Sequence, residues 1–216
     1  MFRDVFARIS MPHIFGTAQI DLFESVDLTP IQLKMLAVEP RQLSALTDQI
    51  CDVADIQYGV RRIKIPYSQT ELVLRFIDRS GQYLHAAAAV LTGGYDPRGA
   101  AQSALLATEL ALKSAGAAVG ISEGALKHEF GHDREKLARA IGNAWPGLDT
   151  DRILRVLATQ PNFIGNRYAA AEPDRLEIGH LAMGAQFVVA EIFRQLSGWS
   201  IRRDALPHPI PRTYPA

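Results

Sequence analysis

A segment near the middle of the chain has the residue types and spacing of a zinc-peptidase motif. It reads His128-Glu129-Phe130-Gly131-His132. In such a motif, two histidines four residues apart on one helix bind zinc, and the glutamate between them activates a water molecule. The third ligand would have to come from Glu172, Glu177 or His180. The spacing therefore allows metal-dependent hydrolysis.

The residues around this segment favour a different local structure. Gly131 would weaken a helix that carries both histidines. Asp133 suits the N-cap or the first turn of a helix that begins there. Residues 120–124 are not strand-like, so the sheet edge that usually holds a peptide substrate is absent. We expect a loop that runs into a helix start, with both histidines partly exposed and off a common face. This interpretation predicts no bound zinc and no other cofactor.

Composition limits the function classes further. The 216 residues correspond to one large domain or two small ones, and 48% of them are hydrophobic, which is enough for a sizeable core. Lys and Arg total 23, as do Asp and Glu, so the formal net charge is zero. A dedicated nucleic-acid binder usually has a basic excess, because contacts with phosphates dominate its affinity. The balance therefore argues mildly against that class.

The cysteine count, the N-terminal residues and the length of the apolar runs predict the cellular compartment of the protein. Cys51 alone cannot form an intrachain disulfide or a cysteine-based zinc cluster, and its apolar neighbours predict a buried, inert thiol. The N-terminus lacks the basic and then apolar pattern of a signal peptide. The longest uninterrupted apolar run, residues 86–91, is far below the roughly 18 residues of a membrane span. We expect a soluble, cytoplasmic protein that does not contact a membrane.

Apolar periodicity and capping residues predict a chain of helices. Thr29 and Pro30 have the types preferred at an N-cap and the first helical position, and open a helix to about Val38. Further helices are expected over residues 40–59, from Ser68 to Gly93, from Pro97 to Ala118, from Asp133 to Ile141 and from Asp149 to Thr159. Between them, residues 116–127 are expected to form a glycine-rich loop.

The last expected helix has the clearest pattern. Asp174 suits its N-cap and Gly198 the position just beyond its end. Its apolar positions recur at steps of three and four, at Ile178, Leu181, Ala185, Val188, Ile192 and Leu196. This helix and the small-residue helix at 97–118 are expected to bury the densest core.

Several of these motifs together resemble those of the HEPN family of small helical bundles. The resemblance rests on Tyr83 and the alanines after it, Ala101-Gln102, and the rhythm Glu109 to Lys113 on the next helix. It continues with Gly131-His132-Asp133-Arg134-Glu135-Lys136-Leu137, and with Arg167-Tyr168 before the last helix. It covers roughly residues 70–197. It implies an all-α, HEPN-like up-and-down helical bundle at 67–200, preceded by a helical extension at 1–66 that packs on it and followed by an extended, proline-rich tail at 201–216.

The resemblance also implies alternatives for function. Some members of the family are metal-independent ribonucleases with an Arg-x4–6-His motif, and Arg175 to His180 meets that spacing, although Leu176 replaces the usual polar residue. His180 could then act as general acid or base, and Arg175 could hold a phosphate. Five residues apart on a helix, the two point about 140° from each other. They could converge only across a dimer interface or at a frayed first turn.

We therefore interpret the chain first as a non-enzymatic helical module that binds a partner protein or a nucleotide. The alternative is a ribonuclease that uses Arg175 and His180, and the third is a zinc metallopeptidase that uses His128, Glu129 and His132. Many family members form dimers, so a homodimer is expected. Two candidate dimer surfaces are Gln102, Leu106, Glu109 and Lys113 on one helix, and the Met183 and Phe187 side of the last helix.

Overall fold

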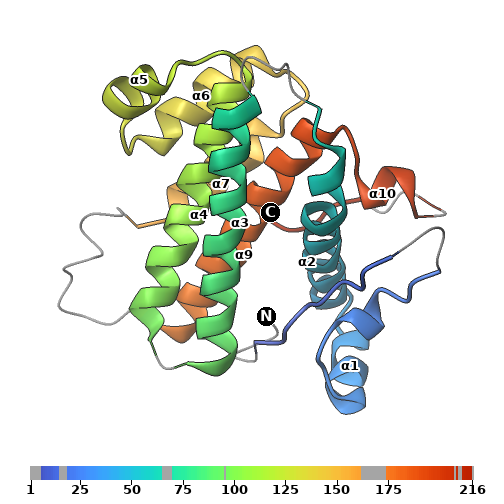
Figure 1. Cartoon of the computed structure of the whole chain (residues 1–216). Coiled ribbons are helices and arrows are strands. Elements are labelled where there is room, and N and C mark those ends of the chain that lie inside the picture. The colour runs from blue at the N-terminus through green and yellow to red at the C-terminus, as the bar shows by residue number, and fades with distance from the viewer. Residues whose placement is uncertain are drawn as a thin grey trace.

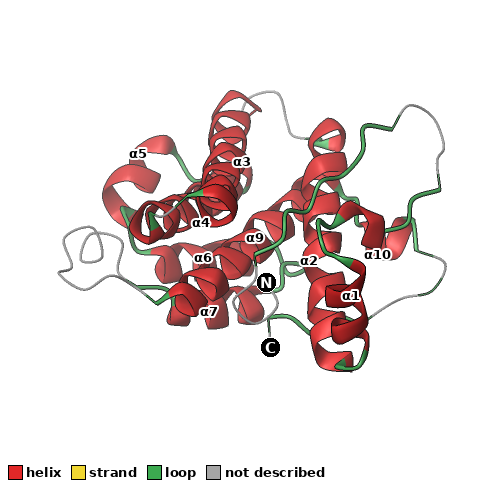
Figure 2. Ribbon diagram, turned by 90° about the horizontal axis from the view of Figure 1, so that it is seen from below, coloured by secondary structure: helices red, strands yellow, loops and turns green. Residues whose placement is uncertain are grey.

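The computed structural model describes residues 6–14, 19–64, 70–94, 96–161, 174–206, 208 and 211–215. These residues form nine α-helices and no β-strand (Figures 1 and 2). The described part contains one isolated antiparallel β-bridge, between Ile9 and Val26. The prediction of an all-α fold is confirmed.

Three long helices form the centre of the molecule: α3 (Thr70–Gly93), α4 (Pro97–Ala118) and α9 (Arg175–Ser197). Two shorter helices pack on this centre: α6 (Arg134–Ala144) lies against α4, and α7 (Thr150–Thr159) lies against α9 (Figures 1 and 2). Alanines dominate the buried positions of α4, so its neighbours approach its backbone closely. As predicted, α4 and α9 contribute the most buried residues of all described helices.

Two buried serines tie α3 to α4. Ser80 Oγ donates to the carbonyl oxygen of Ala107 at 2.8 Å, and Ser114 Oγ donates to that of Val73 at 2.9 Å. Each bond satisfies a hydroxyl that would otherwise be costly to bury. The bonds also fix the register of the two helices, because each joins a defined pair of turns.

The N-terminal part of the chain packs beside this bundle. It comprises an arm, which we define as residues 6–14, a 3-10 turn (Phe23–Ser25), α1 (Pro30–Ala37), α2 (Pro40–Gly59) and a second 3-10 turn (Val60–Arg62). Helix α2 packs along α9, and α1 lies on the side of α2 away from α3 (Figures 1 and 2). Cys51 is fully buried, as predicted, and burial raises the pKa of its thiol to about 11.

Capping residues set the observed helix ends. Thr29 and Asp174 each form a capping box, with Gln32 and Glu177 respectively. The side chains of Asp96, Asp133 and Asp149 accept hydrogen bonds from backbone N–H groups of the first turns of α4, α6 and α7. Gly198 ends α9 with a φ of 65°, a conformation that glycine adopts without strain. The predicted bounds of these helices are confirmed within a few residues.

Two predictions about irregular segments are wrong. Residues 116–127 are not a loop throughout: α4 continues to Ala118, and after a short turn come α5 (Glu123–Ala125) and a π-helical turn (Leu126–Phe130). Leu126 and Phe130 are buried, so packing stabilises helical turns despite the glycines. The tail is not extended from its start, because residues 201–204 form α10 (Ile201–Asp204), anchored by buried Ile201.

Helix α9 is also long and apolar enough to cross a membrane by length and composition. It is the one such helix in the described part of the chain, and 67% of its most apolar stretch is buried inside the bundle. A core helix has these same properties, and α9 contacts α2, α3, α4 and α7.

Candidate functional site

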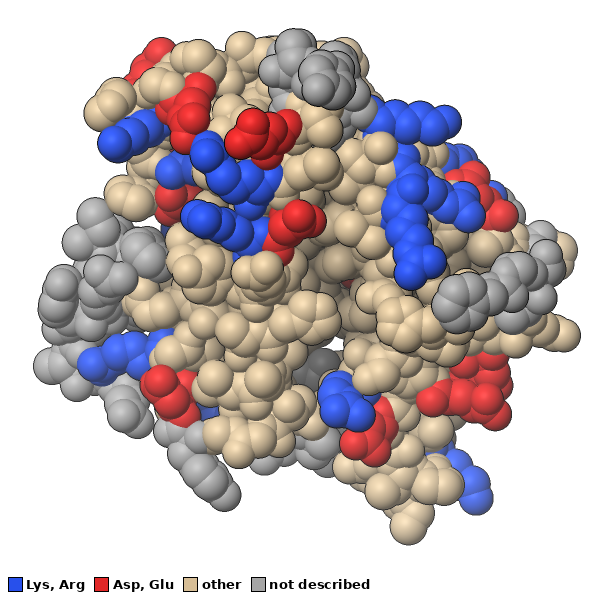
Figure 3. All heavy atoms as spheres, in the orientation of Figure 1, with Lys and Arg blue, Asp and Glu red and all other residues tan. Residues whose placement is uncertain are grey.

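A cleft of about 630 Å³ opens between α2, α3 and α9, with the arm along its edge. Its described lining comes from residues 6–13 of the arm, 49–57 of α2, 81–92 of α3 and 179–186 of α9. In Figure 3 the surface is hollowed between the α3 and α2 sides. Most of the surface around the hollow is tan, so it belongs to residues other than Lys, Arg, Asp and Glu. The volume lies within the range of small-molecule sites, which is about 300–1,000 Å³.

Small and apolar side chains make the walls of this cleft. Ala87 of α3 is fully buried, while Val53 of α2 and Met183 of α9 are partly buried. Alanines on α3 and Gly179 on α9 leave space between helices that larger residues would fill. The walls therefore suit an apolar group.

One buried polar group points to a ligand. Gln49, on α2, is 2% exposed and lines the cleft. Its Oε1 and its backbone carbonyl accept hydrogen bonds from Gln186 Nε2, at 3.0 and 2.9 Å. Its own Nε2 has no hydrogen-bond partner among the described residues. A buried donor without a partner costs about 1–3 kcal/mol, which a ligand acceptor atom would recover.

Arg8 is the one charged side chain in the described lining of the cleft. Arg8, His13 and His85 line it and are exposed, and no Asp or Glu is among its described lining residues. None of the ion pairs of the described chain involves Arg8. A guanidinium beside a cleft without carboxylates favours anionic groups.

Local hydrogen bonds hold the arm in place along the cleft. Beside the Ile9–Val26 bridge, Ser10 N donates to the Ser25 carbonyl at 2.8 Å, and Asp27 N donates to the Arg8 carbonyl at 2.9 Å. The Tyr58 hydroxyl donates to the Pro12 carbonyl at 2.9 Å. These bonds fix the backbone of the arm and leave the Arg8 side chain outside the hydrogen bonding.

The two residues of the predicted ribonuclease pair lie on different sides of α9. Arg175 precedes Gly179, Ala182 and Met183, which line the cleft, at the three- and four-residue steps of one helix face. Its guanidinium lies 4.5 Å from the ring centre of Phe6, another lining residue. Arg175 is not itself a lining residue, but its contact with Phe6 places its guanidinium beside the cleft.

His180 is exposed and falls outside the cleft lining. Its backbone carbonyl lies 3.4 Å from the Tyr214 hydroxyl, in the C-terminal tail. Within one chain, the helix directs Arg175 and His180 to separate surroundings, as the 140° angle between them requires. Whether the pair cleaves RNA stays a prediction.

The residues of the zinc motif are also separated. His128 and Glu129 are exposed on the π-helical turn, and Gly131 ends that turn with a φ of 54°. His132 follows it, with Nδ1 2.9 Å from Glu109 Oε2. No group of three His, Cys, Asp or Glu side chains in the described residues is placed to hold a metal ion. Of the third ligands considered, Glu172 lies outside the described residues, as does the Arg167-Tyr168 pair.

Glu109 instead forms the centre of a polar cluster that joins α4 to the start of α6. Lys113 Nζ donates to Glu109 Oε1 at 2.7 Å, and His132 contacts the other carboxylate oxygen. Beside it, Arg134 donates to Gln160 Oε1 at 2.5 Å and to the Pro161 carbonyl at 3.1 Å. A second hollow of about 520 Å³ lies beside this cluster and is lined by Arg134. The hydrogen bonds to Gln160 and Pro161 already occupy this guanidinium.

The burial of Glu109 corrects one predicted dimer surface, and the burial of Phe187 corrects the other. Glu109 is 4% exposed and Phe187 is 1% exposed. The first is covered by its contacts with Lys113 and the α6 start, and the second lies in the main core. Neither residue is available at an interface, so the two surfaces cannot include them, and the homodimer itself stays a prediction.

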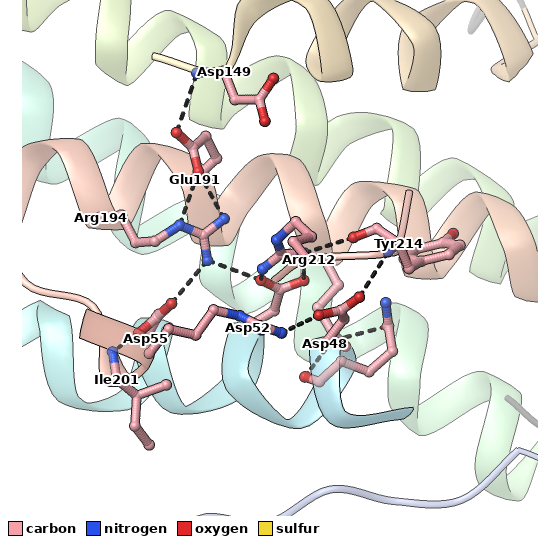
Figure 4. A network of polar contacts seen from close by, with 12 residues as sticks. Asp48, Asp52, Asp55, Asp149, Glu191, Arg194, Ile201, Arg212 and Tyr214 are labelled. Atoms are coloured by element: carbon pink, nitrogen blue, oxygen red, sulfur yellow. Dashed lines mark hydrogen bonds and ion pairs between the residues drawn. The ribbon is translucent and has the colours of Figure 1, made fainter. Parts of the chain in front are cut away.

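A third polar cluster, which we name the carboxylate network, connects both ends of the chain (Figure 4). Asp48, Asp52 and Asp55 lie at steps of four and three on one face of α2 and are at most 1% exposed. Their partners are arginines from later segments. Arg194 of α9 donates to Asp52 and Asp55 at 2.8 Å each, Arg202 of α10 pairs with Asp48, and Arg212 of the tail pairs with Asp52.

The network also binds the backbone of the tail. Asp48 Oδ2 accepts from Thr213 N and Tyr214 N at 2.8 and 2.7 Å, and Asp55 Oδ1 accepts from Ile201 N at 2.6 Å. Every carboxylate in it is paired, so it is a structural connection and no ligand site. Arg202 is part of this buried connection, since its side chain is 13% exposed.

Burial and charge pairing act in opposite directions on the pKa values of the carboxyl groups in this network. Burial raises the pKa of Asp55 above 3.8, against the opposing effect of Arg194. Burial would also raise the pKa of Glu191, but the Arg194 guanidinium and several hydrogen bonds hold it below 4.5. Both shifts identify Arg194 as the cation that compensates these buried carboxylates.

Comparison of the chain with protein-family models, with curated proteins and with solved structures finds no match.

Sequence patterns did not indicate the cleft. Nothing distinguishes Gln49 from a surface glutamine in the sequence, because its burial depends on α9. The network had a signal: three aspartates at 48, 52 and 55 mark one helix face, and the last part of the chain is rich in arginine. Such a face is usually solvated, and only long-range packing makes it buried.

Proposed function

We propose that this protein is a non-enzymatic helical module that binds a small planar ligand, of the nucleotide class, in the cleft between α2, α3 and α9. One observation carries the proposal: the buried Gln49 Nε2 without a partner, in a cleft of about 630 Å³. A ring nitrogen or carbonyl of a nucleobase is an acceptor of the right kind for an amide N–H. The apolar walls suit the faces of the ring.

The polar side chains around the cleft support binding rather than catalysis. The described lining has no Ser-His or Cys-His pair within hydrogen-bond reach, and no carboxylate to act as a base. Arg175 lies beside the lining residue Phe6, while His180 lies on another side of α9. The described lining residues are sufficient for binding. Catalysis would need a nucleophile and a base from outside this lining, for example from a second chain.

Calorimetric titration with the four common nucleosides and their 5′-monophosphates tests the proposal. We expect at least one to bind, and Gln49→Leu to weaken it about tenfold, the equivalent of one lost hydrogen bond. Leu retains the size of the side chain, and Gln186 keeps its bond to the backbone carbonyl of residue 49.

Gln102→Leu is the matched control. Gln102 lies on α4, outside the cleft lining, and its Nε2 and Oε1 are also buried without partners. The same substitution there should leave ligand binding unchanged. Titrations without heat or thermal shift for any of the eight compounds, or equal affinities of the Gln49→Leu variant and the parent, would contradict the proposal.

An assay with total RNA separates this proposal from the ribonuclease alternative. We expect no cleavage. Cleavage by the parent protein that is lost in His180→Ala would favour the enzyme over the binding module.

A further inference from the structure

We infer that the ligand carries an anionic group, of the phosphate type, at the mouth of the cleft, and that Arg8 and Arg175 bind it. The inference rests on the proposed function. It identifies the anionic group as the part of the ligand that the protein recognises. It also gives Arg175 a role separate from His180.

The first support is the position of the two guanidinium groups. Arg8 lies on the arm at the exposed edge of the cleft. Arg175 lies over the ring of Phe6, which is two residues before Arg8. The bridge at Ile9 holds the adjacent Arg8 in place, and Phe6 and Arg8 are both lining residues of the cleft. Both cations therefore belong to the same end of the cleft, beside Phe6.

The second support is the absence of competing anions. None of the described lining residues is an Asp or Glu, and Arg8 takes part in none of the ion pairs between described residues. This contrasts with Arg194, Arg202 and Arg212, each paired with a buried carboxylate. The chain neutralises its arginines where they stabilise the fold, and it leaves a cation at the cleft.

The third support is the fit between the two ends of the cleft. Gln49 offers a neutral donor among buried residues, and the arginines lie at the exposed edge. A nucleoside phosphate has the same order of groups, with an apolar ring bearing acceptors at one end and a dianion at the other. The planar fork of Arg matches phosphate oxygens and can donate two hydrogen bonds to them.

The test compares a nucleoside with its 5′-monophosphate, for adenine and for guanine, by calorimetric titration of the whole chain. We expect the monophosphate to bind about tenfold or more tightly, and its affinity to fall as salt rises, because screening weakens exposed charge pairs. Arg8→Gln and Arg175→Gln should each remove most of this difference between monophosphate and nucleoside.

Arg139→Gln provides the matched control, since Arg139 is an exposed residue of α6 whose side chain is 63% accessible. Thermal melting of each variant verifies that the fold persists. Equal affinity for nucleoside and monophosphate, or a loss of both in Arg8→Gln, would overturn the anion-site inference and leave the proposed function standing. Binding of neither probe would overturn both.

Discussion

Arg194→Ala tests the reasoning on buried charge most directly. The Arg194 side chain is 12% exposed, and its guanidinium donates to Asp52, Asp55 and Glu191 at 2.8 Å each. The two aspartate side chains are fully buried. Its removal leaves three carboxylates near one another without their shared cation.

The magnitude follows from what each carboxylate keeps. Asp52 retains Arg212, Asp55 retains the N–H of Ile201, and Glu191 retains the N–H of Asp149. The loss should therefore resemble the breaking of one buried ion pair, about 3–5 kcal/mol, and not the sum of three. A protein of this kind has a total stability of about 5–15 kcal/mol. For this chain length, we expect the melting temperature to fall by about 6–20 °C.

Urea denaturation followed by circular dichroism gives the free energy of unfolding. Arg139→Ala is the control, because its pair with Glu135 is exposed and should contribute less than about 1 kcal/mol. Adding Asp55→Asn to Arg194→Ala should recover part of the loss, since it removes one uncompensated charge. An Arg194→Ala protein as stable as Arg139→Ala would refute the account of the network.

Four further predictions concern other parts of the molecule. Glu191 has a folded pKa below 4.5, so its contribution to stability is present above pH 4.5 and is lost as the pH falls below that value; Glu191→Gln should flatten this part of the curve of unfolding free energy against pH. Glu109→Ala should destabilise by about 1–3 kcal/mol in urea, because Lys113 and His132 lose their shared acceptor; a change below 0.5 kcal/mol would argue against that cluster. The thiol of Cys51, with its raised pKa of about 11, should react with a thiol reagent at pH 8 only after denaturant is added; fast labelling of the folded protein would contradict its burial. Light scattering should give the mass of a homodimer, and a mass near one chain across a concentration series would exclude it.

The helices could be predicted because their signals are local. Thr29, Asp133, Asp149 and Asp174 cap the first turns that follow them, and the apolar stripe of the last helix has the period of one buried face. The π-helical turn at 126–130 was missed because its glycine-rich surroundings indicate a loop. The burial of Leu126 and Phe130 overrides that local preference.

The candidate site could not be predicted in the same way. Gln49 and Gln186 are 137 residues apart, and neither has a sequence pattern that indicates a buried contact. Arg175 was recognised as a residue that could hold a phosphate, but the sequence paired it with His180 through spacing alone. Helix geometry already separates the two by about 140°, and the packing of α9 against α2 and α3 shows which of them lies beside the cleft.

The carboxylate network has a consequence for the order in which the chain folds. Asp52 is synthesised 142 residues before Arg194 and 160 before Arg212. At about 5–20 residues per second, the wait for Arg194 is roughly 7–28 s. During that time the like charges of α2, four residues apart, oppose formation of the isolated helix. We therefore expect α2 to reach its final packing only after α9 has been made, because Arg194 of α9 supplies the cation that its buried aspartates share.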